Sequence, residues 1–308
     1  MASRTDGTGG LGAGDTPVKP SRFEYFAPES LAEAVALRDA HPGAAVLAGG
    51  QSLLPIMNFR LGRPEQVIDL RKASELAFVR VQNDVVEVGA MTRQRDLERD
   101  EGAARANPLI AESLRLVAHA VIRNRGTVGG SIAHADPAAE LPALLSCLDG
   151  SVEVAGVRGR RRISAGELFV FHLTTSLEPN EVITSVSFPA LEPSWGWSFL
   201  EVTRRHGDFA LAGVCAALKL DGDRCVGQVR LAACGIGTTP VRLSTAEEAL
   251  LSRPLTEKAL REAGRAAAGY VTAGDETQAS TAYRRQLVEA LVRRSLLRAA
   301  ARLERRTS

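Results

Sequence analysis

Ala48-Gly49-Gly50-Gln51-Ser52 lies between a short apolar run, 45–48, and a segment with helical periodicity, 53–61. Glycine has no Cβ, so a Gly-Gly pair lets the chain turn with positive φ and approach a ligand closely. Consecutive N–H groups in such a turn point into one concavity, and the start of the next helix adds positive potential. The segment suits a diphosphate, with Ser52 capping the helix or donating to phosphate. A tight turn without a ligand is the alternative.

A second Gly-Gly pair follows 80 residues later, within Arg125-Gly126-Thr127-Val128-Gly129-Gly130-Ser131. It repeats the pattern of a glycine pair flanked by hydroxyl groups, and we expect a turn there too. It is not a P-loop, because no Gly-Lys-Ser/Thr follows. One diphosphate held from two sides accounts for both segments, so the pair favours a ligand site over two coincidental turns.

The rest of the chain predicts a mixed α+β organisation. Short β segments alternate with helices up to Leu191-Glu192-Pro193-Ser194, which is typical of a domain boundary. Asp136-Pro137 has the N-cap-then-Pro pattern and predicts a helix from there through residue 148. Beyond the boundary we expect three strands and then three helices, 195–202, 209–220, 226–234, 246–251, 257–270 and 283–303. The arginines of the last helix are expected to be solvated.

Composition narrows the class of protein. The chain has 308 residues, a net charge of +2 and a pI of about 8.4, too balanced to indicate nucleic acid or an anionic membrane as partner. Residues 1–20 lack an apolar stretch and are expected to be a disordered leader rather than a secretion signal. The sequence contains no run of 18 apolar residues, so it predicts no membrane-spanning helix. The four cysteines lack metal-ligand spacing and are expected to be buried and reduced, which indicates the cytoplasm.

Four segments in order resemble the flavin-binding medium subunits of the molybdenum hydroxylases. That family includes aerobic carbon monoxide dehydrogenase, the flavin domain of xanthine dehydrogenase, and nicotine and caffeine dehydrogenases. The resemblance covers nearly all of the chain from Phe23 to about residue 300. The matching segments are Ala48–Ser52 with Leu53-Leu54-Pro55, Val88–Thr92, Ile122–Ser131 with Asp136-Pro137 and Glu140-Leu141-Pro142, and Arg205–Ala210.

The resemblance implies a fold and a set of site residues. It implies an FAD-binding domain of the p-cresol methylhydroxylase type, 21–192, in two α+β subdomains. A smaller C-terminal domain, 195–304, would have a three-stranded antiparallel sheet and three helices. The two glycine segments would hold the diphosphate, Glu140 the ribose or adenosine side, Leu177 the flavin region, and Asp208 the isoalloxazine edge. The implied cofactor contacts are Ala48, Gly49, Gly50, Gln51, Ser52, Leu53, Thr92, Thr127, Gly129, Gly130, Ser131, Glu140, Leu177 and Asp208.

The resemblance also implies that the steps of the reaction are divided among several subunits. FAD would be bound non-covalently, and this chain would carry no catalytic residue or metal. A small [2Fe-2S] subunit would pass electrons to the flavin from a large molybdopterin-binding subunit, in a dimer of heterotrimers, and an external acceptor would receive them. Many members have a lysine where this chain has Leu200, followed by Glu201, so the role of that lysine does not carry over. A self-sufficient FAD-dependent oxidase or reductase and a flavin-free scaffold are the alternatives.

Overall fold

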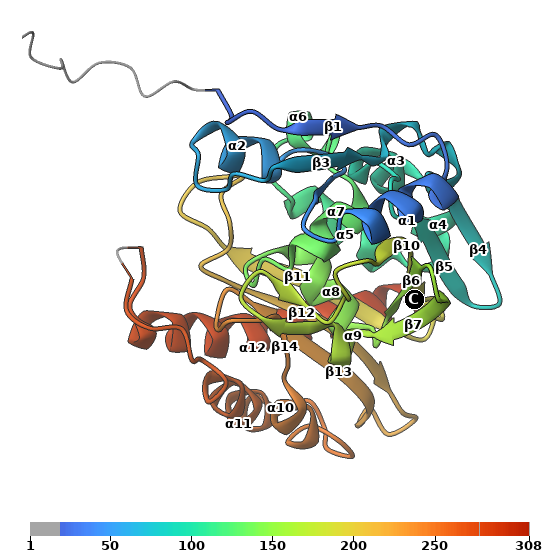
Figure 1. Ribbon diagram of the computed structural model, residues 1–308. Coiled ribbons are helices and arrows are strands. Elements are labelled where there is room, and N and C mark those ends of the chain that lie inside the picture. The colour runs from blue at the N-terminus through green and yellow to red at the C-terminus, as the bar shows by residue number, and fades with distance from the viewer. Residues whose placement is uncertain (1–18, 277, 308) are drawn as a thin grey trace, which may run out of the picture.

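The computed structural model describes residues 19–276 and 278–307 (Figure 1). The predicted leader, 1–20, lies outside this range except for its last two residues. Three sheets follow one another along the chain, and a two-stranded ribbon lies apart from them. This is the α+β fold expected from the sequence.

The first sheet is parallel, with strand order β1-β3-β2. Its first helix begins after Ser30, whose hydroxyl accepts the N–H of Glu33 at 3.2 Å. The Ala48–Ser52 segment connects the edge strand β2 to the second helix. The elements are β1 (Glu24–Phe26), α1 (Leu31–Ala40), β2 (Ala45–Leu47), α2 (Leu53–Asn58) and β3 (Gln66–Asp69).

The second sheet is five-stranded and antiparallel, with strand order β4-β5-β10-β6-β7. Seven helices and the β8-β9 ribbon belong to the same part of the chain. The elements are β4 (Val79–Gln82), β5 (Val85–Gly89), α3 (Gln94–Arg99), α4 (Glu101–Ala106), α5 (Pro108–Leu116), α6 (Ala120–Arg123), α7 (Val128–His134), α8 (Glu140–Cys147), β6 (Ser151–Gly156), β7 (Gly159–Ser164), α9 (Ala165–Leu168), β8 (Phe169–Phe171), β9 (Thr174–Thr175) and β10 (Val182–Pro189).

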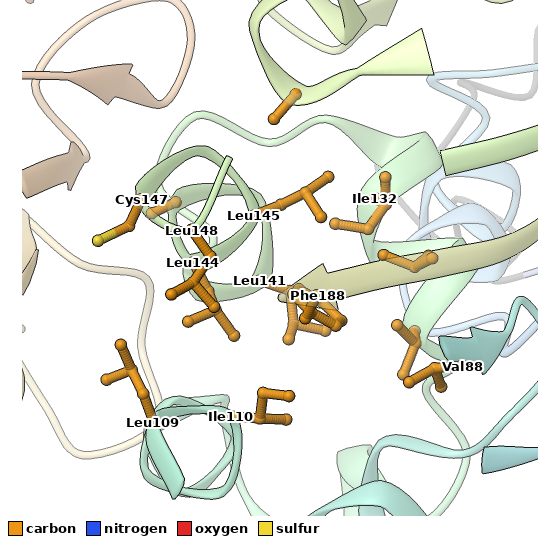
Figure 2. Packing of buried hydrophobic residues seen from close by; sticks show 14 of the residues in the cluster. Val88, Leu109, Ile110, Ile132, Leu141, Leu144, Leu145, Cys147, Leu148 and Phe188 are labelled. Carbon is orange, nitrogen blue, oxygen red and sulfur yellow. The ribbon is translucent and has the colours of Figure 1, made fainter. Parts of the chain in front are cut away.

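Helix α8 is buried along nearly its whole length. Its leucines pack against α5, α7 and the strands β5 and β10 (Figure 2). The prediction that this helix begins at Asp136 is wrong. The Asp136 carboxylate accepts the N–H of Ala138 at 2.8 Å and closes a turn, so the helix starts four residues later, at Glu140.

The third sheet has strand order β11-β12-β13-β14. Its three long strands were expected, and the two-residue edge strand β14 was not. Helices α10–α12 cover one face, as the orange and red ribbons of Figure 1 show. The elements are β11 (Gly196–Val202), β12 (Ala212–Leu220), β13 (Val226–Cys234), β14 (Val241–Arg242), α10 (Ser244–Glu248), α11 (Glu257–Ala268) and α12 (Thr281–Thr307).

Both faces of β12 are buried, and they belong to different cores. Val214 and Ala216 pack with the C-terminal helices, whereas Cys215 and Ala217 join the core that contains α8. The core that contains α8 is therefore shared by both parts of the chain, and a second core lies between the third sheet and the C-terminal helices. No helix within the described residues combines the length and the apolar character that crossing a membrane requires.

The first arginine of α12 differs from the expectation of a solvated side chain. Arg284 is buried, donates to the carbonyl of Leu211 at 2.6 Å, and pairs with Glu276 at 2.6 Å. A buried guanidinium is stable there because two backbone carbonyls and a carboxylate accept hydrogen bonds from its terminal N–H groups. It anchors the start of α12 to the loop that precedes β12.

The shared core predicts a large stability loss when α8 is truncated. Leu144→Ala should lower the free energy of unfolding by about 2–5 kcal/mol, because it removes a fully buried side chain and leaves a cavity. Leu297→Ala, on α12 and 42% exposed, is the matched control and should change it by less than about 1 kcal/mol. Urea unfolding followed by circular dichroism measures both, and equal losses would contradict the placement of α8.

Candidate functional site

A cavity of about 650 Å³ lies where the three sheets meet. This volume is typical of small-molecule sites. Its walls come from the β2–α2 segment, the start of α7, the region around Glu140, strand β10 and the loop before β12. Of the fourteen residues predicted as cofactor contacts, thirteen line it.

The exception is Thr92, which is buried behind the wall. Its hydroxyl donates to the carbonyl of Phe78 at 2.8 Å and accepts that residue's N–H at 3.0 Å. Its carbonyl accepts the N–H of Val128 at 3.0 Å. Thr92 therefore supports the segment that precedes α7 rather than lining the cavity.

The first glycine segment forms the turn that the sequence predicts. Gly50 has a φ of +74°, which disfavours any residue with a Cβ. The side chain of Gln51 donates to the carbonyl of Gly49 at 3.0 Å and braces the turn. Within the described residues, no hydrogen-bond acceptor is found for the backbone N–H groups of 49–53. These groups are free to bind an anionic ligand.

The second glycine segment does not repeat this geometry. Gly129 and Gly130 lie inside the first turn of α7, which Thr127 caps, and neither has positive φ. Their N–H groups are paired within the chain, with the carbonyl of Ala90 at 2.9 Å and the hydroxyl of Thr127 at 3.1 Å. The expectation that this glycine pair forms a turn is wrong, because the cap on Thr127 starts a helix there; the turn of this segment comes earlier, at 124–125. The segment forms a wall instead of a second set of free donors.

Both glycine segments are needed for close backbone packing. A Cβ on Gly49 would lie 2.5 Å from the carbonyl oxygen of Arg125, and one on Gly129 would lie 2.5 Å from the Cβ of Ala90. Contacts this short do not occur without movement of the backbone. These two glycines hold three distant segments together, which the sequence alone did not reveal.

The charged side chains in the wall are carboxylates, and no lysine or arginine is among the described lining residues. Burial raises the pKa of Glu140 to about 7, although its own backbone N–H opposes the shift. Two hydrogen bonds from Arg161, at 2.6 and 2.7 Å, lower the pKa of Glu181 instead. Burial also lowers the pKa of His134, while the charge of Asp136 opposes the shift.

The C-terminal part contributes the loop Gly207-Asp208-Phe209 to the cavity. Gly207 has a φ of +88° and lies against the ring of His119, where a Cβ would be 2.7 Å from Nε2. The rings of His119 and His206 lie 5.3 Å apart, which brings the loop against α6. Phe209 is 56% exposed, so an apolar ring stands at the mouth of the cavity.

Leu200 does not reach this site. It packs with the C-terminal helices, whereas its neighbour Glu201 points to the opposite face of β11, toward α8. Met91 and Ile122, which lie in two of the matching segments, and His134, which follows the second glycine segment, also line the wall. The sequence missed others, among them Gln94 and Glu181. They share no spacing or residue type that would have identified them. No group of three or more described side chains is placed to hold a metal ion.

Residues 21–191 match the family model described as the FAD binding domain in molybdopterin dehydrogenase. The chain belongs to this family. Residues 197–299 match the CO dehydrogenase flavoprotein C-terminal domain. The two matches confirm the resemblance that the glycine segments indicated and make this chain an FAD-binding subunit of the molybdenum hydroxylase type.

Curated relatives share this arrangement over nearly their full length. The carbon monoxide dehydrogenase medium chain of Hydrogenophaga pseudoflava is 36% identical, and the match covers 92% of this chain and 99% of the relative. The alpha subunit of the 6-hydroxypseudooxynicotine dehydrogenase complex of Paenarthrobacter nicotinovorans is also 36% identical, with 92% and 96% covered.

Solved structures of the family superimpose closely. A carbon monoxide dehydrogenase from Hydrogenophaga pseudoflava gives a TM-score of 0.90 at 37% identity, over 92% of this chain and 99% of that chain. Quinoline 2-oxidoreductase from Pseudomonas putida 86 gives 0.88 at 34% identity with the same coverage. The fold, the flavoprotein family and the assignment to a dehydrogenase complex are thereby confirmed.

Because Gly129 packs closely against Ala90, we expect Gly129→Ala to lower both the stability of the chain and its flavin content. The added methyl group would overlap Ala90 and should lower the free energy of unfolding by about 1–3 kcal/mol. Gly166→Ala is the matched control, since no atom lies within 4 Å of its new Cβ, and it should be neutral or slightly stabilising. Urea unfolding and flavin content per chain measure both effects. A Gly129→Ala variant with wild-type values would refute this packing.

Proposed function

We propose that the cavity holds one FAD per chain without a covalent bond, with its diphosphate at Gly49–Leu53. The free N–H groups of that segment carry the proposal, because they are donors without acceptors in a cavity of suitable size. Each hydrogen bond to a charged oxygen contributes about 1.5–3 kcal/mol. Several such bonds can hold a diphosphate although no basic side chain lines the wall.

The other predicted contacts fit an elongated cofactor. Thr127, Gly130 and Ser131 would form the wall beside the diphosphate, where a Cβ on Gly130 would lie 2.6 Å from the Thr127 hydroxyl and 3.3 Å from the Cβ of Ala48. Glu140 would face the ribose or adenosine side and Leu177 the flavin region. Asp208 would lie near the isoalloxazine edge, which places the redox-active ring near the exposed Phe209.

In this role the chain positions the flavin and tunes its potential, while FAD supplies electron transfer in steps of one or two electrons. A small [2Fe-2S] subunit would deliver the electrons that a large molybdopterin-binding subunit takes from the substrate. The named relatives are subunits and medium chains of dehydrogenases, which supports partners of this kind. We further propose a dimer of heterotrimers in the cytoplasm and a docking surface that includes Arg205–Phe209.

The proposal predicts yellow protein whose flavin is released on denaturation. Acid precipitation should leave FAD in the supernatant at one per chain, because no residue of the cavity is expected to attach it. Chromatography of the supernatant against FAD and FMN standards identifies the flavin. Colour that stays in the pellet, FMN in the supernatant, or a chain that cannot be loaded with flavin would each refute the proposal.

The isolated chain should bind FAD but oxidise none of the substrates of its complex. Co-expressed with the two partner subunits, it should be purified as an assembly in which substrate bleaches the flavin under anaerobic conditions. The measurement is flavin absorbance after substrate addition, with and without partners. Bleaching in the isolated chain would favour a self-sufficient oxidase or reductase, and lack of bleaching in a complete, metal-loaded assembly would favour a scaffold.

A further inference from the structure

Glu181 lies in the wall between two cavities. It lines the cavity of about 650 Å³ and also a smaller one of about 180 Å³ at the turn of the β6–β7 hairpin. Arg161 of β7 lines the smaller cavity and is not among the described residues that line the larger one. The hairpin lies beside the start of β10, where Val182 is paired with Ala155 of β6 (Figure 1). A side chain outside the larger cavity can therefore reach Glu181.

Arg161 binds the Glu181 carboxylate at two points. Its Nε donates to Oε1 at 2.6 Å, and its Nη2 donates to Oε2 at 2.7 Å. Paired hydrogen bonds of this kind are the strong form of arginine–carboxylate contact. The Glu181 side chain is 9% exposed and the Arg161 side chain is 44% exposed. The charge of a poorly solvated acid is thus compensated by a cation that reaches it from the surface.

The loop before β10 holds the same carboxylate without help from Arg161. Glu181 Oε2 accepts the N–H of Glu178 at 2.8 Å. This bond keeps the acid in the wall when Arg161 is removed, and a glutamine side chain offers the same acceptor. The carboxylate would then lose its compensating charge, because Arg158, at the hairpin turn, is paired with Glu178.

We propose that Arg161 is a positioning residue of the FAD site, which acts through Glu181 and compensates its negative charge so that an anionic cofactor can bind beside it. Arg161 itself does not touch the cofactor. The inference rests on the proposed function, and it names the cation that makes an acidic wall suitable for FAD.

The need for compensation follows from the charges of the ligand and the wall. FAD brings a doubly negative diphosphate into a cavity whose described wall has no lysine or arginine. An unpaired carboxylate in that wall repels the ligand, and the repulsion is strong where water is excluded, because the effective dielectric constant is low. The two hydrogen bonds from Arg161 also lower the pKa of Glu181, so its charge persists at neutral pH and is compensated rather than removed.

Arg161→Met removes the cation and keeps a side chain of similar reach. Titration of the apo-protein with FAD at pH 8, followed by flavin fluorescence, should give a Kd about ten-fold above that of the wild type. Arg161→Lys restores the charge without the two-point geometry, so its Kd should lie between these two values. Thermal unfolding followed by circular dichroism establishes that each variant is folded.

A double variant, Arg161→Met with Glu181→Gln, decides whether the effect passes through the carboxylate. It removes both charges together and retains an acceptor for the N–H of Glu178, so its Kd should return to within about three-fold of the wild type. A purely structural role of Arg161 would leave the double variant as weak as Arg161→Met. Glu181→Gln alone leaves the cation without its partner and should bind FAD about three-fold more tightly than the wild type.

Arg160→Met is the matched control. Arg160 precedes Arg161 on the same strand, so its side chain points to the opposite face of the sheet, where it pairs with Glu153 at 2.7 Å. Neither residue of this pair is among the described residues that line the larger cavity. The substitution removes a cation from the same hairpin and should change the Kd for FAD by less than about two-fold.

Equal Kd values for the wild type and Arg161→Met, no recovery in the double variant, or an equal loss in Arg160→Met would each overturn the inference. If Arg161→Met does not fold, Glu181→Gln carries the test, and a Kd no lower than that of the wild type would overturn the inference. Failure of the wild-type chain to bind FAD would instead overturn the proposed function, whatever the variants do.

Discussion

The architecture of the cavity depends on backbone packing against backbone at two glycines. Gly49 lies against 125–127, and Gly129 lies against Ala90, so close that neither place has room for a side chain. Each contact joins segments far apart in the sequence, from the parallel sheet, from α7 and from the turn after β5. Segment 49–53, whose N–H groups have no acceptor in the described chain, lines the cavity because this packing holds its loop in place.

Helix α8 connects the packing around the cavity to the C-terminal part of the chain. Its leucines fill the core between α5, α7 and β10 (Figure 2). On its other side, the thiol of Cys147 donates to the carbonyl of Cys215 in the third sheet at 3.6 Å. A helix buried on both sides fixes the position of its first residue, and here that residue is Glu140. The same helix therefore determines where the buried carboxyl group of Glu140 lies in the cavity wall.

The sequence revealed the features that depend on interactions between residues close together in the chain. The glycine segments, the capped helix after Ser30 and the long strands depend on local patterns and were predicted. The role of Gly129 was not predicted, because a Gly-Gly pair can occur in a turn and also in the first turn of a capped helix. The helix start at Glu140 was missed because Asp136 closes a turn before it. Arg284 looked solvated because its partners, the carbonyl of Leu211 and Glu276, are set by tertiary packing.

The charge of the cavity limits how an anionic cofactor can bind there. A diphosphate usually meets lysine or arginine, yet the described wall has neither and offers N–H groups, hydroxyls, side-chain amides, an imidazole and acids. Backbone donors can replace a cation only if nearby carboxyl groups do not repel the ligand. Glu181 meets this condition through its two hydrogen bonds with Arg161, and Glu140 meets it through burial, which raises its pKa to about 7. Two acids in one wall are thus made compatible with FAD by different physical means, one by ion pairing and the other by protonation.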